Sequence, residues 1–240
     1  MNGVDGAQPM LLPMGRPRSG MSSVLIHPAG GGLGAYAGVV LKLGRRGPVF
    51  GIRGHGLAPG ETPDTTVAAM TDRYLTLLDS LPDPPDLLFG WSLGGVVAWE
   101  LAARLRSSSG RRPRVVMVDS PAAGIDRDPS AARRWRERVR ESLTENGGFP
   151  ADRVARTVEA HLDAVTAYRV AGEHDCPTLL LPCAQEENAA HLAAWRSATP
   201  QLTVRPLPGG HFTAFDREQL PLLLGHLDEF LAATTEATRA

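Results

Sequence analysis

The stretch that most constrains the fold of this chain is an apolar run followed by a glycine-rich turn and a helical segment. It reads DLLF at 86–89, GWSLGG at 90–95 and VVAWELAARL at 96–105. The string G-x-S-x-G is weak evidence alone, but a preceding strand and a following helix make it specific for a nucleophile on a tight turn. Such a turn lifts the Ser92 hydroxyl above the sheet edge, while Gly90 and Gly94 relieve crowding. We predict Ser92 as the nucleophile rather than an incidental serine in a glycine-rich turn.

Around this turn, short apolar runs alternate with helical stretches from Ser22 onward. The apolar and β-branched character of these runs indicates strands covered on both faces, as in a parallel sheet. Expected strands cover residues 23–27, 48–53, 86–89, 114–118, 177–182 and 201–207, and expected helices cover 34–43, 65–81, 96–106, 130–143, 151–170, 189–197 and 217–232. The pattern predicts one α/β domain over residues 22–240, with a mostly parallel, doubly wound sheet and a helical insertion at about 121–176.

Composition argues against several other classes of protein. With 42% hydrophobic residues, 21% charged residues and a net charge of -1, the chain is ordinary globular material and no nucleic-acid-binding protein. No apolar run reaches the length of a membrane span, and the Gly- and Pro-rich residues 1–21 are typical of a flexible leader or linker. Cys176 and Cys183 make neither a disulfide framework nor a zinc site, so we expect no metal or other cofactor and a reducing cytoplasm.

The chain has seven histidines, which are the candidates for the general base. His211 follows the last expected strand in the loop PGGHF, which is where an α/β hydrolase carries its histidine. His55 lies in a Gly-rich turn and His27 ends the first strand, so a substrate contact and a structural role stay open for them. The histidines in helical or insertion segments are expected at the surface; they are His161, His174, His191 and His226.

The acid of the site has two candidate positions. Asp119 ends the strand RVVMV, and the loop after the next strand offers Glu186 and Glu187 instead. We favour Asp119, because a strand end fixes a carboxylate more firmly than a longer loop does. Its role would be to hold the histidine tautomer and to stabilise the imidazolium.

Two backbone N–H groups are needed to stabilise the anion of a tetrahedral intermediate. The turn itself supplies the amide of Leu93, the residue after the nucleophile. The second donor is expected from the loop HPAGGG at 27–32, with Ala29 favoured and Gly30 as the alternative. A phosphate-binding loop is disfavoured, because no G-x-x-x-x-G-K-[ST] pattern follows.

With these residues in place, the chain resembles the thioesterase domains of nonribosomal peptide synthetases and polyketide synthases, members of the α/β-hydrolase superfamily. The resemblance is carried by VLIHPAGGGLGAYAGVVLKLG, PVFGIRGHGL, FGWSLGGVVAWELAARL, VVMVDSP and PGGHF, in the family's order. It implies an acylated Ser92, with Asp119 and His211 as its partners and Ala29 and Leu93 as oxyanion donors. It also implies that residues 121–176 form a lid over the acyl channel.

The same resemblance implies a substrate held as a thioester on the phosphopantetheine arm of an acyl or peptidyl carrier protein. Water would then release a free acid, and an internal amine or hydroxyl would release a ring. Stand-alone editing thioesterases usually carry their acid after the following strand, where this chain has Glu186 and Glu187. That departure favours the terminal, product-releasing branch; a natural stand-alone enzyme and an excised domain both stay open.

Other functions remain as alternatives. A carboxylesterase, lipase or editing thioesterase could use the same three side chains. A non-catalytic relative is disfavoured, because the Ser, His and Asp set is complete.

One further segment, RRWRERVR at 133–140, is rich in arginine. Helical spacing spreads its arginines around much of the circumference. The segment is therefore either a solvated lid helix or, in part, a contact for the pantetheine phosphate or an acidic carrier surface. The arginines are Arg133, Arg134, Arg136, Arg138 and Arg140.

Overall fold

The computed structural model describes residues 8–16, 18–123, 129–142, 148–184 and 189–239 and contains one seven-stranded sheet. Its strand order is β1-β3-β2-β4-β5-β6-β7, and every neighbouring pair is parallel except β1 with β3. The strands are β1 Leu11–Pro13, β2 Ser23–Ile26, β3 Val49–Ile52, β4 Leu87–Trp91, β5 Arg114–Val118, β6 Thr178–Leu181 and β7 Leu202–Val204. The mostly parallel, doubly wound sheet expected from the sequence is confirmed.

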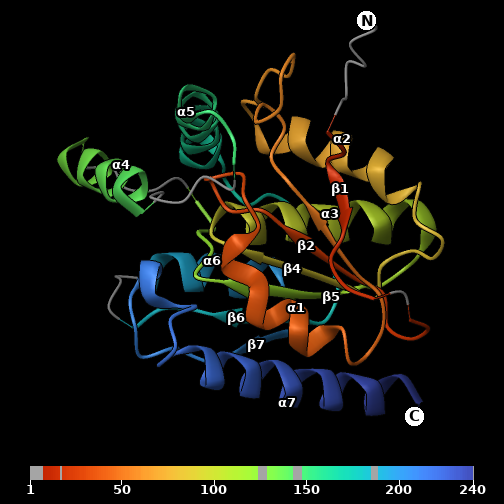
Figure 1. The fold of residues 1–240 in the computed structure, drawn as a ribbon. Coiled ribbons are helices and arrows are strands. Elements are labelled where there is room, and N and C mark those ends of the chain that lie inside the picture. Colours follow the sequence, from red (N-terminus) through yellow and green to blue (C-terminus); the bar gives the residue numbers. More distant parts are fainter. Residues whose placement is uncertain (1–7, 17, 124–128, 143–147, 185–188, 240) are drawn as a thin grey trace, which may run out of the picture.

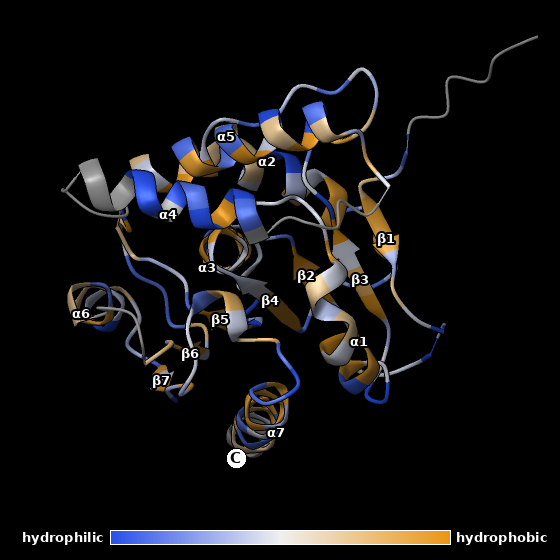
Figure 2. Ribbon diagram, turned by 60° about the vertical axis from the view of Figure 1, so that its left-hand side comes forward, coloured by the Kyte–Doolittle hydropathy of each residue, from blue (hydrophilic) through white to orange (hydrophobic). Residues whose placement is uncertain are grey.

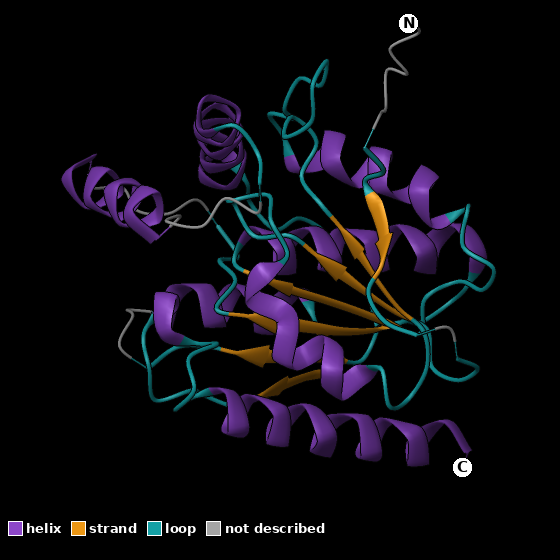
Figure 3. Ribbon diagram, viewed as in Figure 1, coloured by secondary structure: helices purple, strands orange, loops and turns teal. Residues whose placement is uncertain are grey.

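Helices cover both faces of this sheet (Figure 1, Figure 3). They are α1 Ala37–Leu43, α2 Val67–Leu78, α3 Leu93–Ser109, α4 Pro129–Ser142, α5 Ala151–Ala167, α6 Ala189–Ala198 and α7 Leu220–Arg239, with the short 3-10 helices η1 Gly34–Tyr36 and η2 His211–Thr213. One apolar cluster joins alternate strand residues to α2, α3 and α6, and a second joins the intervening residues to α1 and α7. Burial on both faces explains why the central strands are apolar at nearly every position.

The expectation of a flexible leader over residues 1–21 is wrong for its middle part. Leu11–Pro13 form β1 and pair antiparallel with Phe50–Ile52 at the edge of the sheet. The buried guanidinium of Arg53 adds to this attachment by donating to the carbonyl oxygens of Gln8 and Pro9. A three-residue strand that ends in proline is too short to show alternating apolar and polar residues. It can be recognised only from its pairing with the neighbouring strand.

The insertion between β5 and β6 contains the two expected helices, α4 and α5. Among its described residues, the β structure is one isolated bridge between Ala123 and Arg169. Figure 1 shows α4 and α5 outside the two helical layers, on the side toward which the parallel strands run. In Figure 2, α4 is hydrophilic along most of its length, unlike the helices that pack on the sheet. The insertion therefore lies next to the strand ends that carry the predicted site residues.

Three other features concern membranes, metals and thiols. None of the helices in the described ranges is both long and apolar enough to cross a bilayer. The described residues also contain no group of His, Cys, Asp and Glu side chains arranged to hold a metal ion. Cys176 and Cys183 are free thiols and fully or nearly fully buried. Burial raises the pKa of Cys176 to about 11, so this side chain acts as a small apolar packing group.

Candidate active site

The turn from β4 to α3 holds Ser92 in a strained conformation. Its φ of 55° and ψ of -122° lie where residues other than glycine are rarely found, and its amide donates to the carbonyl of Val118 at 2.8 Å. A Cβ atom on Gly90 would overlap the backbone of Gly94, and one on Gly94 would overlap the carbonyl oxygen of Ile26. The two glycines therefore let the turn close tightly enough to place Ser92 at the first turn of α3.

Asp119 and His211 meet at the same edge of the sheet. Asp119 follows β5 with a φ of 44°, and its Oδ2 accepts a hydrogen bond from His211 Nδ1 at 2.7 Å. Its other oxygen, Oδ1, accepts from the amide of Cys183 at 2.8 Å. Because both carboxylate oxygens accept hydrogen bonds, the proton of neutral His211 lies on Nδ1 and Nε2 carries the lone pair. This is the tautomer that a general base needs.

Aromatic rings enclose the His211 imidazole. The ring centroids of Trp91 and Phe212 lie 5.1 Å and 5.0 Å from it, and His211 is only 6% exposed. Ser92 is 3% exposed, and both side chains line the same cavity. The predicted nucleophile and base are thus nearly buried beside one cavity, where electrostatic interactions are stronger than at an exposed surface.

Among the described residues, the competing base candidate His27 is not brought to Asp119. Glu186 and Glu187 lie outside the described residues. His27 is fully buried and bonds to Tyr74 and to the Pro28 carbonyl, away from Asp119. The expectation of a surface position is wrong for His161, which is fully buried, and for His174, which packs against the Trp99 ring and is 7% exposed.

The loop after β2 lies beside the nucleophile turn. Ala29 is nearly buried and lines the cavity together with Pro28 and Gly30, whereas Leu93 is fully buried at the N-terminus of α3. Within the described ranges, the amide N–H groups of Ala29 and Leu93 have no hydrogen-bond acceptor. An unpaired N–H at a helix start, together with the helix dipole, favours an anion beside it.

The cavity has a volume of about 790 Å³ and a mostly apolar lining. Its walls come from the domain core and from the insertion, including Leu33, Leu57, Trp91, Phe215, Val139 and Val154. Arg53 lines it too, but its guanidinium makes two hydrogen bonds to Glu61 at 2.7 and 2.8 Å. Burial alone would raise the pKa of Glu61. The hydrogen bonds from Arg53 and from two backbone amides have the larger effect and lower this pKa to about 2. The charge of Arg53 is therefore balanced, and the cavity suits an apolar chain.

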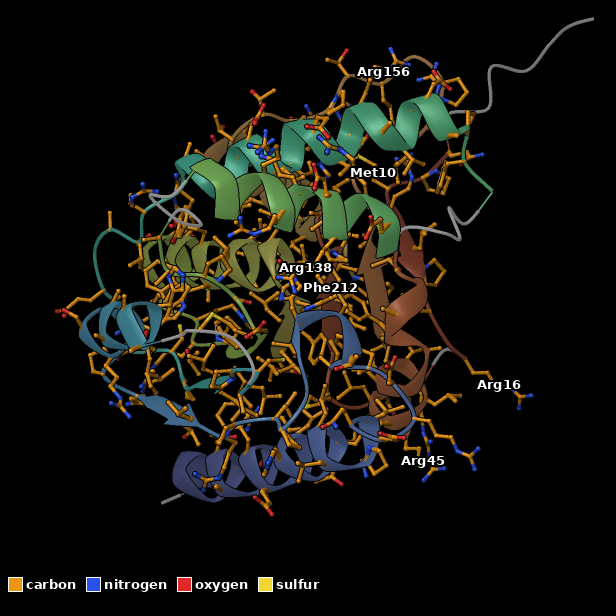
Figure 4. All side chains as sticks on the ribbon, turned by 90° about the vertical axis from the view of Figure 1, so that its left-hand side faces the viewer. Met10, Arg16, Arg45, Arg138, Arg156 and Phe212 are labelled. Carbon is orange, nitrogen blue, oxygen red and sulfur yellow. The ribbon has the colours of Figure 1, made fainter. Side chains whose placement is uncertain are left out.

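The arginines of α4 divide among three surroundings, as their helical spacing predicts. Arg136 and Arg140 form ion pairs with acidic residues of α5, at 2.7 Å to Asp163 and 2.6 Å to Glu159. Arg138 lies over the ring of Phe212, the neighbour of His211, at 5.4 Å (Figure 4). Exposed Arg133 makes none of these contacts. The helix thus reaches both α5 and the mouth of the cavity.

Comparison with known proteins gives consistent matches. A family model described as "Thioesterase domain" matches residues 24–231. Thioesterase frbE of Dothideomycetidae sp. (strain 11243) is 27% identical over 90% of this chain and 90% of its own length. The dimodular nonribosomal peptide synthase of Bacillus subtilis (strain 168) is 30% identical over 50% of this chain. That match spans only 5% of the synthase.

Solved structures agree with these matches. RedJ, a thioesterase from the prodiginine biosynthetic pathway in Streptomyces coelicolor, has a TM-score of 0.72 and 27% identity, covering 89% of this chain and 91% of RedJ. The NocB thioesterase domain from the nocardicin cluster has a TM-score of 0.70 and 25% identity, covering 90% and 95%. These structures confirm the α/β-hydrolase fold expected from the sequence.

Proposed function

Because this chain belongs to the thioesterase family, as its motifs predicted, we propose that it releases an acyl or peptidyl chain from a carrier protein through an acyl-enzyme on Ser92. The observation that carries the proposal is the 2.7 Å bond between His211 and Asp119, at the cavity that Ser92 also lines. The carrier is inferred from multidomain synthetase relatives, of which this chain spans only a small part. Two buried free cysteines are consistent with a cytoplasmic location.

In the first half-reaction, Ser92 Oγ attacks the thioester carbonyl while His211 Nε2 takes its proton. Asp119 holds the ring in the reactive tautomer and stabilises the imidazolium. The developing oxyanion accepts hydrogen bonds from the amides of Leu93 and Ala29. Collapse of this intermediate breaks the carbon–sulfur bond, and His211 returns its proton to the departing pantetheine thiol.

In the second half-reaction, a nucleophile attacks the ester on Ser92. His211 deprotonates either water, which gives a free acid, or an amine or hydroxyl of the chain itself, which gives a ring. Collapse of this second intermediate breaks the bond between the acyl carbon and Ser92 Oγ, and His211 returns the proton to Oγ. The cavity supports an acyl chain with a largely apolar surface, since the charged side chains among its described lining residues are Arg53, paired with Glu61, and Asp216. The apolar side chains that α4 and α5 contribute to the cavity wall support the insertion as a lid over this chain.

The alternative is a stand-alone editing thioesterase or a carboxylesterase with the same three side chains. Comparing kcat/KM for a carrier-bound acyl thioester with kcat/KM for simple esters separates a carrier-dependent thioesterase from an esterase. We expect the carrier-bound substrate to be strongly preferred, and equal values would favour the esterase.

Labelling with a fluorophosphonate tests the nucleophile itself. The wild-type protein should gain the mass of one phosphonyl group, and Ser92→Ala should gain none. Ser120→Ala is the matched control, because Ser120 is a buried serine at the end of the neighbouring strand and should not alter labelling. Labelling that survives Ser92→Ala would exclude Ser92 as the nucleophile.

A further inference from the structure

A buried chain of hydrogen bonds leads from α2 to the loop that carries Ala29. The hydroxyl of Tyr74 lies 2.5 Å from His27 Nε2, and His27 Nδ1 lies 2.7 Å from the carbonyl oxygen of Pro28. Tyr74 and His27 are both fully buried. None of these groups has a part in the chemistry described above, yet the chain ends at the peptide that supplies the Ala29 N–H.

The direction of each hydrogen bond follows from the groups themselves. The Pro28 carbonyl can only accept, so His27 Nδ1 carries the proton and Nε2 is the acceptor for the Tyr74 hydroxyl. Burial, with the nearby His161 and Arg53 acting in the same direction, lowers the pKa of His27 to about 3. Burial also raises the pKa of Tyr74, so its hydroxyl keeps its proton and donates. At neutral pH the ring is therefore held in one tautomer.

The Pro28 carbonyl and the Ala29 N–H belong to one planar, trans peptide unit and point in opposite directions. Fixing the carbonyl therefore fixes the direction of the N–H. The same oxygen also accepts from the Gly31 amide at 2.8 Å, so both of its lone pairs are engaged. Hydrogen bonds to a carbonyl oxygen also polarise the amide and strengthen its N–H as a donor.

His161 of α5 continues this arrangement onto the insertion. Its ring stacks on His27 with centroids 4.8 Å apart and planes 20° apart, and its Nδ1 lies 2.9 Å from the Ala29 carbonyl oxygen. A Cβ atom on Gly54 would come within 2.9 Å of this ring, so the glycine leaves the space that the ring fills. Two stacked imidazoles thus bind two successive carbonyls of the loop.

We propose that Tyr74 and His27 are positioning residues that orient the Ala29 N–H toward the oxyanion, with His161 holding the next peptide from the insertion. This inference rests on the proposed function, because it assigns a purpose to Ala29 as an oxyanion donor. The oriented Ala29 N–H stabilises the transition state, in which the oxyanion exists, and not the bound substrate. Loss of this orientation should therefore lower kcat with little change in KM.

The test is Tyr74→Phe, which removes one hydroxyl and keeps the ring. On an acyl thioester of N-acetylcysteamine, kcat should fall by roughly tenfold while KM stays within about twofold, since a donor is loosened rather than removed. An alkyl boronic acid that forms a tetrahedral anion on Ser92 should bind more weakly by a similar factor. Tyr168→Phe is the matched control, because its hydroxyl donates to Glu100 at 2.8 Å, far along the chain from the loop.

A pair of substitutions at His27 separates positioning from packing. The amide nitrogen of His27→Asn can take the place of Nδ1 and still donate to the Pro28 carbonyl, whereas that of His27→Gln takes the place of Nε2. We expect His27→Asn to retain the larger share of kcat at similar thermal stability.

An unchanged kcat and boronate affinity in Tyr74→Phe would overturn the inference, as would equal losses in the two His27 variants. Ser92→Ala is measured alongside. If it keeps its activity, the proposed function fails, and if it loses activity while Tyr74→Phe does not, the inference alone fails.

Discussion

The two hydrogen bonds to the carboxylate of Asp119 allow the effect of Asp119→Asn to be worked out. An asparagine side chain has one acceptor oxygen and one donor nitrogen in place of two acceptors. If its oxygen keeps the bond to the Cys183 amide, its NH₂ group faces His211 Nδ1 and forces that nitrogen to accept. The proton then moves to Nε2, and His211 can no longer take the proton of Ser92.

The opposite orientation of the amide restores the tautomer at a cost. In this orientation the NH₂ group faces the Cys183 N–H. Two donors then meet without an acceptor, and leaving buried donors unpaired costs about 1–3 kcal/mol. Losing the carboxylate charge beside the imidazolium costs about a further 1.5–3 kcal/mol, the value of a hydrogen bond to a charged group. Together these losses correspond to a fall in kcat of roughly 10² to 10⁴.

The assay is thiol release from a small acyl thioester, followed with a thiol reagent in the steady state. Asp86→Asn is the matched control, because Asp86 accepts a backbone N–H at the opposite end of the sheet and should keep near-parental activity. Glu186→Gln combined with Glu187→Gln should also be nearly silent. If that double variant lost activity while Asp119→Asn kept it, the acid would lie on the later loop and Asp119 would be excluded from this role.

Three other predictions concern packing, acid stability and docking. Gly94→Ala should lower the free energy of unfolding by at least about 2 kcal/mol in urea, because its methyl group meets backbone, whereas Gly225→Ala, with open space around it, should not. Since the pKa of Glu61 is lowered to about 2, wild-type stability should fall as the pH drops from about 4.5 toward 2. Glu61→Gln should flatten that pH dependence of the melting temperature. Arg133→Gln should reduce kcat/KM for the carrier-bound substrate about twofold to fivefold at low salt but not for the small thioester, whereas Arg45→Gln, remote from α4 (Figure 4), should change neither.

Much of the sheet and of the candidate site follows from local sequence. The strands between 23 and 118 are apolar and β-branched because both faces are buried, and the glycines around Ser92 reveal a turn that only small residues permit. Asp119 and His211 were predictable because parallel strands end at one edge of a sheet, which brings distant loop residues together. Their 2.7 Å bond agrees with that expectation.

The features that could not be predicted from the sequence depend mainly on tertiary contacts. Leu11–Pro13 become a strand only because β3 offers an edge. The burial of His161 had a local signal that was missed: it lies three residues after Val158 and four before Val165, on the apolar face of α5. The bond between His27 and Tyr74 joins residues 47 positions apart, and nothing in either segment specifies it.

The most direct test of Ser92 as the acylated nucleophile is to find where the acyl group resides during turnover. The protein is mixed with an acyl carrier thioester, quenched in acid within the first turnover, digested and analysed by mass spectrometry. We expect one acyl group on the peptide that contains Ser92, accumulating in His211→Ala only very slowly and in Ser92→Ala not at all. An acyl group on another residue, or product release by Ser92→Ala at the parental rate, would contradict this role of Ser92.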